Sequence, residues 1–251
     1  MSGSFDDNGA LIIGDGKIIT FVGKKRSGKS VAAKLMFDSY PGDKIVLDIA
    51  GDDGPYGDDI PELTGHTVDT MPRRWPESMR DGDKPMTLRF VPDGGSDTFL
   101  HDMDAVLALA MAHGSRERAK GRMGCAVLVH EMGVIAEVHK TPKHLRRALM
   151  HNRHNAVSLF FCGPRTQTID PLVIAQSDVV YVFELMNPDD RKRLAQTIGW
   201  NPRELDEAID DLGPHEYLRF DANEMKPEPG KDDIRLLHFP ALPRKAVKRF
   251  L

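Results

Sequence analysis

The sequence predicts an α/β protein in which a mainly parallel sheet is covered by helices on both faces. Two observations lead to this prediction. Continuous apolar runs, typical of strands buried on both sides, alternate along the chain with segments of helical period. A glycine-containing loop also follows the first apolar run and precedes a helix, as in nucleotide-binding α/β folds. The length of 251 residues suits one large domain with a short appendage.

The order of elements follows from these runs and from the residues that interrupt them. Strands are expected at residues 18–22, 44–49, 86–91, 125–129, 157–162 and 179–185. Helices are expected at residues 30–39, 98–113, 142–152, 188–198 and 202–211. The last two begin with proline, which suits the first position of a helix. Residues 51 to about 83, rich in glycine, proline and acidic side chains, indicate loops.

The composition changes after Glu224, where MKPEPGKDD indicates a linker and RKAVKRF a basic tail. We therefore expect a globular domain at residues 1–224, followed by a C-terminal linker and basic arm at residues 225–251.

Composition also narrows the class of protein. Cys125 and Cys162 lie in apolar runs, which predicts two buried thiols on adjacent strands and no disulfide framework. No apolar stretch approaches the roughly 20 residues that cross a bilayer, and the first residues lack the pattern of a signal peptide. We expect a cytoplasmic protein without a membrane partner. The net charge of −4 means that any contact with nucleic acid must come from local clusters of cations.

The loop at residues 23–30 matches the phosphate-binding pattern GxxxxGK[ST] at every fixed position. An apolar strand precedes it and an apolar-faced helix follows, so backbone N–H groups and the helix N-terminus are expected to surround a polyphosphate. Lys29 is expected to reach the β- and γ-phosphates, and the Ser30 hydroxyl to bind Mg²⁺. The predicted ligand is a nucleoside triphosphate, most simply ATP. Its binding residues are expected to be Gly23, Lys24, Lys25, Arg26, Ser27, Gly28, Lys29, Ser30 and Val31.

A second part of the site is expected at the end of a neighbouring strand, where hydrolysis needs a carboxylate to activate water. The run CAVLVHE ends in His130 and Glu131, and Glu131 is the candidate for this role. His130 stands where an aspartate is usual, and its imidazole would hydrogen-bond a metal-bound water without adding negative charge. Asp48, at the end of another strand, is a further candidate near the metal.

From residue 130 onwards the order of segments becomes distinctive. A basic helix follows Glu131, Arg153 precedes a turn of small residues, and the next apolar strand leads into GPRT at residues 163–166. An Ile-Asp segment, another strand and a charged helix complete the series. Across about residues 16–218, the chain resembles the HerA/FtsK superfamily of ring-forming, DNA-pumping P-loop ATPases.

This resemblance implies a RecA-like ATPase domain that forms a homo-oligomeric ring, usually a hexamer, with double-stranded DNA in its pore. It implies that Arg153 acts at the subunit boundary, with Arg146, Arg147 and Arg165 as alternatives. The chain departs from the family pattern at His130 and at Pro164, which replaces a glutamine. A compact core of this kind looks like the genome-packaging ATPases of some viruses, which would be associated with a capsid.

Two basic clusters are candidates for contact with DNA phosphates. Lys140 and Lys143 precede the basic helix, in a loop that faces the pore in FtsK-type motors. The second cluster consists of Arg116, Arg118, Lys120 and Arg122. No motif for reading base sequence accompanies either cluster, so DNA binding is expected to be independent of sequence.

Three functions remain open at this point. The first is an ATP-driven translocase of double-stranded DNA, and the second is an ATPase subunit that powers or gates an effector, as in HerA-containing defence complexes. The third, a small-molecule kinase, is disfavoured because no lid segment rich in arginine is evident. A GTPase and a transporter-type ATPase are disfavoured because the chain contains neither NKxD nor LSGGQ.

Overall fold

A single mixed sheet forms the centre of the computed structural model, which describes residues 13–49, 60–62, 74–75, 81–82, 84–138, 140–222 and 237–239. Within these residues the sheet has eight strands in the order β3-β2-β4-β5-β1-β6-β7-β8. The strands are β1 (Ile18–Val22), β2 (Asp43–Asp48), β3 (Thr87–Phe90), β4 (Cys125–His130), β5 (Val157–Gly163), β6 (Val179–Val182), β7 (Tyr217–Asp221) and β8 (Leu237–Phe239).

The first six strands of the chain are parallel, and β7 and β8 extend the sheet in antiparallel pairing beyond β6. Parallel strands need crossover connections, and the helices that provide these cover both faces of the sheet. The carboxyl ends of β1 to β6 therefore meet at one edge, where ligands of such sheets bind.

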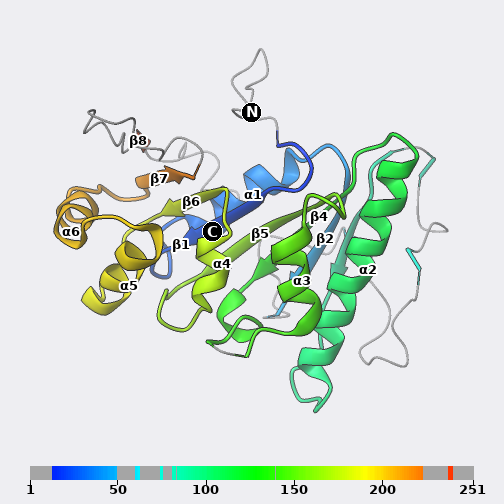
Figure 1. Ribbon diagram of the computed structural model, residues 1–251, viewed down its shortest axis with the longest axis horizontal. Coiled ribbons are helices and arrows are strands. Elements are labelled where there is room, and N and C mark those ends of the chain that lie inside the picture. The colour runs from blue at the N-terminus through cyan, green and yellow to red at the C-terminus, as the bar shows by residue number, and fades with distance from the viewer. Residues whose placement is uncertain are drawn as a thin grey trace.

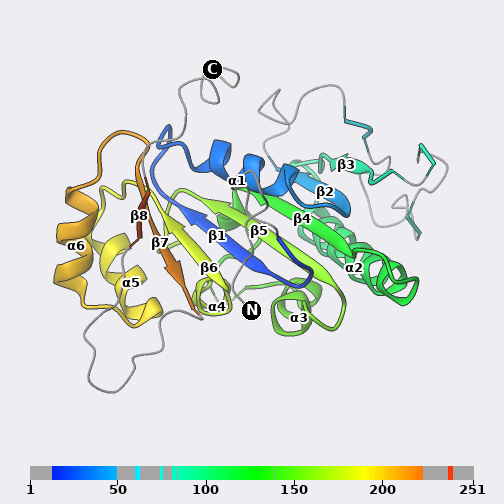
Figure 2. The same ribbon diagram turned by 90° about the horizontal axis from the view of Figure 1, so that it is seen from above.

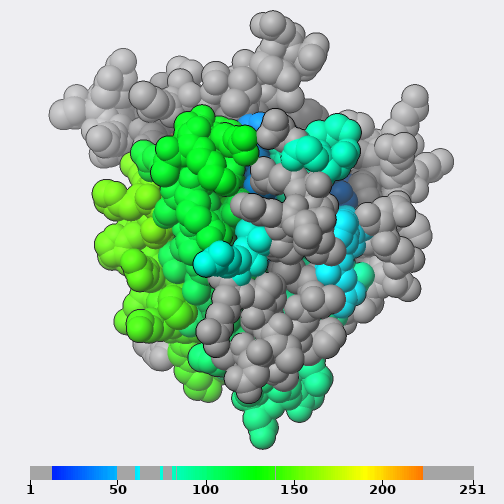
Figure 3. Space-filling model, turned by 90° about the vertical axis from the view of Figure 1, so that its right-hand side faces the viewer, coloured from blue at the N-terminus to red at the C-terminus, as the bar shows by residue number. Residues whose placement is uncertain are grey.

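The helices lie on the two faces of the sheet as the apolar pattern requires (Figures 1 and 2). Helix α1 (Lys29–Asp38) covers one face, and α2 (Phe99–Ala119), α3 (Lys143–His151) and α4 (Pro171–Ala175) cover the other. Helices α5 (Pro188–Ile198) and α6 (Pro202–Asp210) lie at the end of the sheet that carries β7. Helix α2 lies at the opposite end, on the side that faces the viewer in Figure 3.

Alternation along each strand divides the buried side chains into two cores. In β1, Ile18 and Val22 belong to the core beneath α2 to α6, whereas Ile19 and Phe21 pack with Phe37 of α1. A strand that is buried on both sides therefore contributes to both cores, and β1 is buried at all five positions, Thr20 included. This two-sided burial explains why the strands are continuous apolar runs in the sequence.

Each of the six strands and five helices expected from the sequence is present. Helix α2 runs to Ala119, beyond the expected end at residue 113, and its last turn carries Arg116 and Arg118, which favour the negative end of a helix dipole. The sequence analysis missed α4, β7 and β8. Asp170 and Pro171 were a signal for α4, since the Asp170 carboxylate accepts the Leu172 N–H at 2.9 Å as an N-cap.

The structure tests only some of the remaining predictions from the sequence. Cys125 and Cys162 are buried free thiols on the adjacent strands β4 and β5, as predicted. The loops expected at residues 51–83 and the domain boundary at Glu224 fall almost wholly outside the described residues, so they stay predictions. Within the predicted C-terminal arm, β8 pairs with β7. Among the described helices none has the length and apolar character to span a membrane.

Candidate nucleotide-binding site

The glycine loop connects the carboxyl end of β1 to the first turn of α1. Two hydrogen bonds fix its entry: the Gly23 N–H donates to the Gly163 carbonyl at 3.3 Å, and the Lys24 N–H donates to the Glu184 carbonyl at 2.8 Å. The Lys24 ammonium also pairs with the Glu184 carboxylate. The loop is thus anchored to the ends of β5 and β6, the strands on either side of β1.

The backbone of the loop takes conformations that only certain residues tolerate. Gly23 has φ 156° and lies so close to β6 that an added Cβ would be 2.6 Å from the Phe183 Cβ. Gly28, which precedes α1, has φ 99°, and Arg26 has φ 64°. The two fixed glycines of the pattern are therefore required by the backbone.

Lys29 is buried and forms no ion pair with another described residue. Only 6% of the residue is exposed, its Nζ donates to the Lys24 carbonyl at 3.4 Å, and no carboxylate of the described residues forms an ion pair with it. Burial lowers the pKa of the Lys29 ammonium below 10.5, while Cys162 and Glu131 act in the opposite direction. The buried Ser27 hydroxyl also has no hydrogen-bond partner among the described residues. Both groups fit an anion such as a polyphosphate.

The end of β4 approaches the same loop. The Ser30 hydroxyl lies 3.3 Å from His130 Nε2, so the histidine occupies the position opposite the expected magnesium-binding serine. Glu131 follows in the left-handed region, with φ 63° and ψ 50°, and its charge acts on the Lys29 ammonium. A left-handed glutamate is uncommon and is a form of strain found at functional sites.

The sequence analysis placed Glu131 at the end of a strand next to β1, and the observed order of strands differs from this expectation. β4 is not adjacent to β1, because β5 lies between them. The loop after β5 is therefore placed between the glycine loop and the Glu131 turn. Asp190 of α5 holds this loop: its carboxylate accepts the Gln167 N–H at 2.8 Å and pairs with Arg165 at 3.2 Å, and the Thr166 hydroxyl donates to its backbone carbonyl at 2.6 Å.

Asp48 lies at the same edge but is already paired. It is the register partner of His130, and its buried carboxylate lies 2.9 Å from a guanidinium nitrogen of Arg89 in β3. A direct role in metal binding would require this ion pair to open. Arg89 was not among the predicted site residues, since nothing in its local sequence indicates its partner.

The side chains at this site suit a Mg²⁺ ion that takes most of its ligands from phosphate oxygens and waters. In the described part of the chain, no three His, Cys, Asp or Glu side chains gather to hold an ion. Mg²⁺ keeps several waters and binds at such sites through one or two protein oxygens and the substrate phosphates. The Ser30 hydroxyl, with His130 Nε2 3.3 Å away, is the protein oxygen that would hold such an ion.

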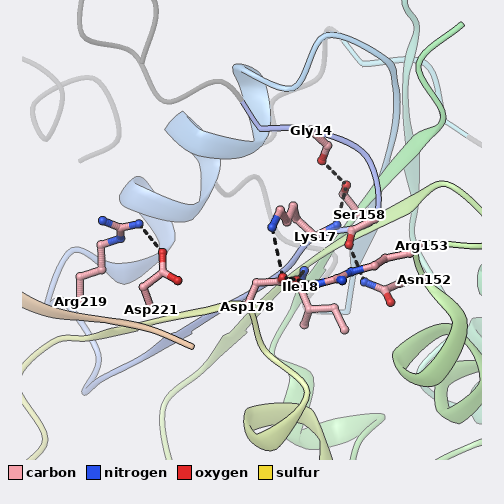
Figure 4. Close-up of polar contacts among 10 residues, drawn as sticks. Gly14, Lys17, Ile18, Asn152, Arg153, Ser158, Asp178, Arg219 and Asp221 are labelled. Atoms are coloured by element: carbon pink, nitrogen blue, oxygen red, sulfur yellow. Dashed lines mark hydrogen bonds and ion pairs between the residues drawn. The ribbon is translucent and has the colours of Figure 1, made fainter. Parts of the chain in front are cut away.

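Arg153 lies at the opposite edge of the sheet from the glycine loop, next to Asp178 (Figure 4). It precedes β5 and pairs with Asp178, which precedes β6, whereas the loop follows β1. β1 alone separates the two edges by about 13 Å. Arg153 therefore lies far from a nucleotide bound at the glycine loop of its own subunit, and 70% of its side chain is exposed.

The two basic clusters lie at different edges. Lys140 is exposed and pairs with Glu137 at 3.1 Å, and Lys143 is exposed at the start of α3, at the carboxyl edge. The second cluster spans the last turn of α2 and the residues after it, at the amino edge, where Lys120 and Arg122 both pair with the buried carboxylate of Glu117. Each cluster therefore contains cations that are partly neutralised, and the first differs in lying at the same edge of the sheet as the glycine loop.

A parallel sheet, a GxxxxGKS loop after β1 and a glutamate after β4 define the class of P-loop NTPase folds. No protein-family model and no curated protein matches the chain. Solved structures do match. The genome packaging NTPase B204 of Sulfolobus turreted icosahedral virus 2, in complex with ATP-gammaS, has a TM-score of 0.63 and 18% identity over 91% of this chain and 98% of its own.

Two further structures are similar. The DNA-packaging ATPase B204 of Sulfolobus turreted icosahedral virus has a TM-score of 0.59 and 19% identity, with 84% of this chain and 95% of that chain covered. The pCW3 conjugation coupling protein TcpA has a TM-score of 0.51 and 12% identity, covering 94% of this chain and 65% of that chain. At 12 to 20% identity these likenesses show the fold alone: the chain has the RecA-like α/β fold of P-loop ATPases, as predicted.

Proposed function

We propose that this protein hydrolyses ATP with Mg²⁺ and uses the energy to move double-stranded DNA through a homo-oligomeric ring. The observation that carries the proposal is Lys29, a buried ammonium without a carboxylate partner among the described residues, next to Glu131 and the Ser30–His130 contact. Such a constellation stabilises the charge that spreads over a γ-phosphoryl group during transfer.

Each residue has a role in this proposal. Backbone N–H groups of the loop and the Lys29 ammonium bind the β- and γ-phosphates, and Mg²⁺, which neutralises charge on those phosphates, is held at the Ser30 hydroxyl. Glu131 accepts a proton from the attacking water, or orients that water, in line with the phosphorus atom. His130 and Asp48 act through waters at the metal. A neighbouring subunit supplies Arg153 to the transition state.

Two observations support DNA as the cargo: the similarity to solved structures of DNA-handling proteins, and the exposed positive charge of Lys140 and Lys143. The similar proteins include a genome packaging NTPase and a conjugation coupling protein. Lys140 and Lys143 are exposed at the carboxyl edge, where ring symmetry would multiply each phosphate contact. Packaging of a viral genome, with a capsid partner, is the form of this function that the packaging neighbours favour. A hexamer is the expected ring.

The alternative is an ATPase subunit that drives an effector protein, with DNA movement secondary. A triplex-displacement assay separates the two. A translocase releases a labelled third strand from the end of a duplex in an ATP-dependent manner, with Lys29→Met as the inactive control. If the protein hydrolyses ATP but displaces no third strand under conditions in which it binds duplex, the translocase proposal fails. A kinase is tested by gel filtration, where it would run as a 28.0 kDa monomer even with nucleotide.

A further inference from the structure

Helix α3 carries an exposed row of positive groups that the nucleotide site does not use. Its buried side, Leu145, Ala148 and Leu149, packs on the sheet. The outward side consists of exposed residues three or four positions apart, which places them on one face of the helix. We name this surface the α3 basic face: Lys143, Arg146, Arg147 and His151. In Figure 1, α3 lies in front of the sheet.

The charge of this face contrasts with the rest of the chain. The whole protein has 38 acidic and 34 basic residues, yet residues 140–154 contain no aspartate or glutamate. Within the described residues, no carboxylate pairs with the side chains of Lys143, Arg146 or Arg147. Other exposed helix arginines do have a carboxylate partner, as in the pair of Arg203 with Glu207 at 3.0 Å on α6.

The cations are also placed where they disfavour the helix. Lys143 and Arg146 lie in the first turn of α3, which has no acidic residue, although the N-terminus of a helix favours negative charge. A carboxylate from another helix compensates: Asp104 of α2 accepts the N–H groups of His144 and Leu145, each at 2.9 Å. Cations kept at the unfavourable end of a helix, with a cap supplied from outside, indicate a surface that serves an anionic partner.

We infer that the α3 basic face binds the phosphate backbone of double-stranded DNA; this rests on the proposed DNA-handling function and extends it beyond Lys140 and the loop. Four positive or titratable groups lie along about 12 Å of helix, and duplex DNA carries one charge per roughly 1.7 Å of its axis. The face consists of lysine, arginine and histidine, and we expect these cations to contact the phosphates, which carry no base-sequence information.

The test is equilibrium binding of the full chain to a fluorescein-labelled 30-base-pair duplex, measured by fluorescence anisotropy from 50 to 300 mM KCl. The variant is Arg146→Ala/Arg147→Ala, which suits a helix because alanine is its best former. The matched control, Lys192→Ala/Arg203→Ala, removes the same charge from exposed positions of α5 and α6. Circular dichroism melts confirm that both are folded, and Arg146→Gln/Arg147→Gln replaces the alanine variant if its melting temperature falls.

Loss of two phosphate contacts reduces the slope of log K against log salt by about 1.8 per bound copy. We expect this change in the α3 variant, with an affinity at 100 mM KCl at least about tenfold lower, and we expect the control to match the wild type. An unchanged slope in the α3 variant, while Lys140→Ala alone weakens binding, overturns the inference and leaves the proposed function intact.

Two further outcomes would also overturn it. If the wild type does not bind duplex at any salt concentration, both the inference and the proposed DNA function fail. If an oligoglutamate of equal charge displaces the duplex as well as unlabelled duplex does, and binds the α3 variant less tightly than the wild type, the face recognises an acidic protein segment instead. Weak competition by oligoglutamate supports the DNA assignment.

Discussion

Arg153 and Asp178 form an ion pair at the amino edge of the sheet, with Nη2 3.0 Å from Oδ1. Asp178 is itself anchored to β1, because it accepts the Ile18 N–H at 2.9 Å and pairs with Lys17 at 3.2 Å (Figure 4). The arginine is thus held in place at the edge opposite Lys29. If Arg153 takes part in catalysis, it must act on a nucleotide bound to another subunit.

A mixture of two inactive variants tests this role. Arg153→Ala and Glu131→Gln should each lower the ATPase rate, the former by about 10³-fold or more. In a mixed ring, an Arg153→Ala subunit keeps its own Glu131 and receives Arg153 from a Glu131→Gln neighbour. Random equimolar rings complete about a quarter of their interfaces in this way, so part of the ATPase activity should return.

The fold should survive the substitution, since Lys17 and the Ile18 N–H remain on the Asp178 carboxylate. Light scattering verifies that the mixture assembles, and Arg203→Ala mixed with Glu131→Gln is the control for mixing itself. A mixture that assembles and stays inactive would refute the role of Arg153 in a neighbour's site.

Lys29→Met should abolish nucleotide binding and stabilise the free protein. The substitution removes a buried charge, and each ~1 kcal/mol of relief raises Tm by roughly 2–4 °C in a chain of this size. The stabilisation of about 2.7 kcal/mol that ATP gives the wild type at 100 times its Kd should disappear. Thermal unfolding with and without ATP measures both effects, and Lys192→Met, at an exposed position of α5, is the control.

The same pair of proteins should differ in the pH dependence of stability. The pKa of Lys29 is lower in the folded chain than its ordinary value of 10.5, so between these values the unfolded chain binds more protons. Stability contributed by this group therefore rises with pH through that window. The advantage of Lys29→Met over the wild type should shrink as pH approaches 10.5; a constant difference would contradict the burial of a charged Lys29.

Glu131→Gln should separate binding from hydrolysis. The amide cannot accept a proton, so kcat should fall by about 10²–10⁴-fold, whereas the Kd for ATP should change little because Lys29 and the loop are intact. Isothermal titration and steady-state hydrolysis give the two values. Hydrolysis at the wild-type rate would show that another group activates the water, and Glu137→Gln, an exposed carboxylate further along the loop, is the matched control.

His130→Asp should strengthen the dependence on magnesium. The position lies 3.3 Å from the Ser30 hydroxyl, and a carboxylate there adds negative charge, while the neighbouring Asp48 is neutralised by Arg89. The Mg²⁺ concentration that gives half-maximal ATPase activity should fall on the order of tenfold. An unchanged titration would place the metal elsewhere, and His154→Asp, an exposed histidine near the opposite edge, reports any general effect of charge.

The local pattern of apolar and polar residues was sufficient to predict most of the strands and helices. Buried parallel strands are continuous apolar runs, and the glycine loop is a contiguous motif, so β1, α1 and the Lys29–Ser30 pair were predictable. β7 was not predicted because its short sequence, YLRFD, mixes polar and apolar residues. It belongs to the antiparallel part of the sheet, where strands are less uniformly apolar. Strand order was not accessible either, because pairing of β5 between β4 and β1 depends on contacts between distant segments.

The same limit applies to the site. The sequence pointed to Glu131, Ser30 and His130 because strand ends of a parallel sheet converge. The partners that hold the site, such as Asp178 on Arg153, Asp190 on the loop after β5 and Arg89 on Asp48, have no local signal. The two members of each of these contacts come from distant parts of the chain and meet only in the folded protein. The long-range ion pairs of the site therefore could not be predicted from the sequence.

The most direct test of the central claim is the ATPase rate of the wild-type protein with and without a long duplex. We expect duplex DNA to raise the rate several-fold at low salt, with the effect declining steeply as salt increases because phosphate contacts release counterions. Lys29→Met should show no hydrolysis in either condition. A wild-type rate that is the same with and without duplex, measured where anisotropy shows that the duplex is bound, would contradict coupling of ATP hydrolysis to DNA.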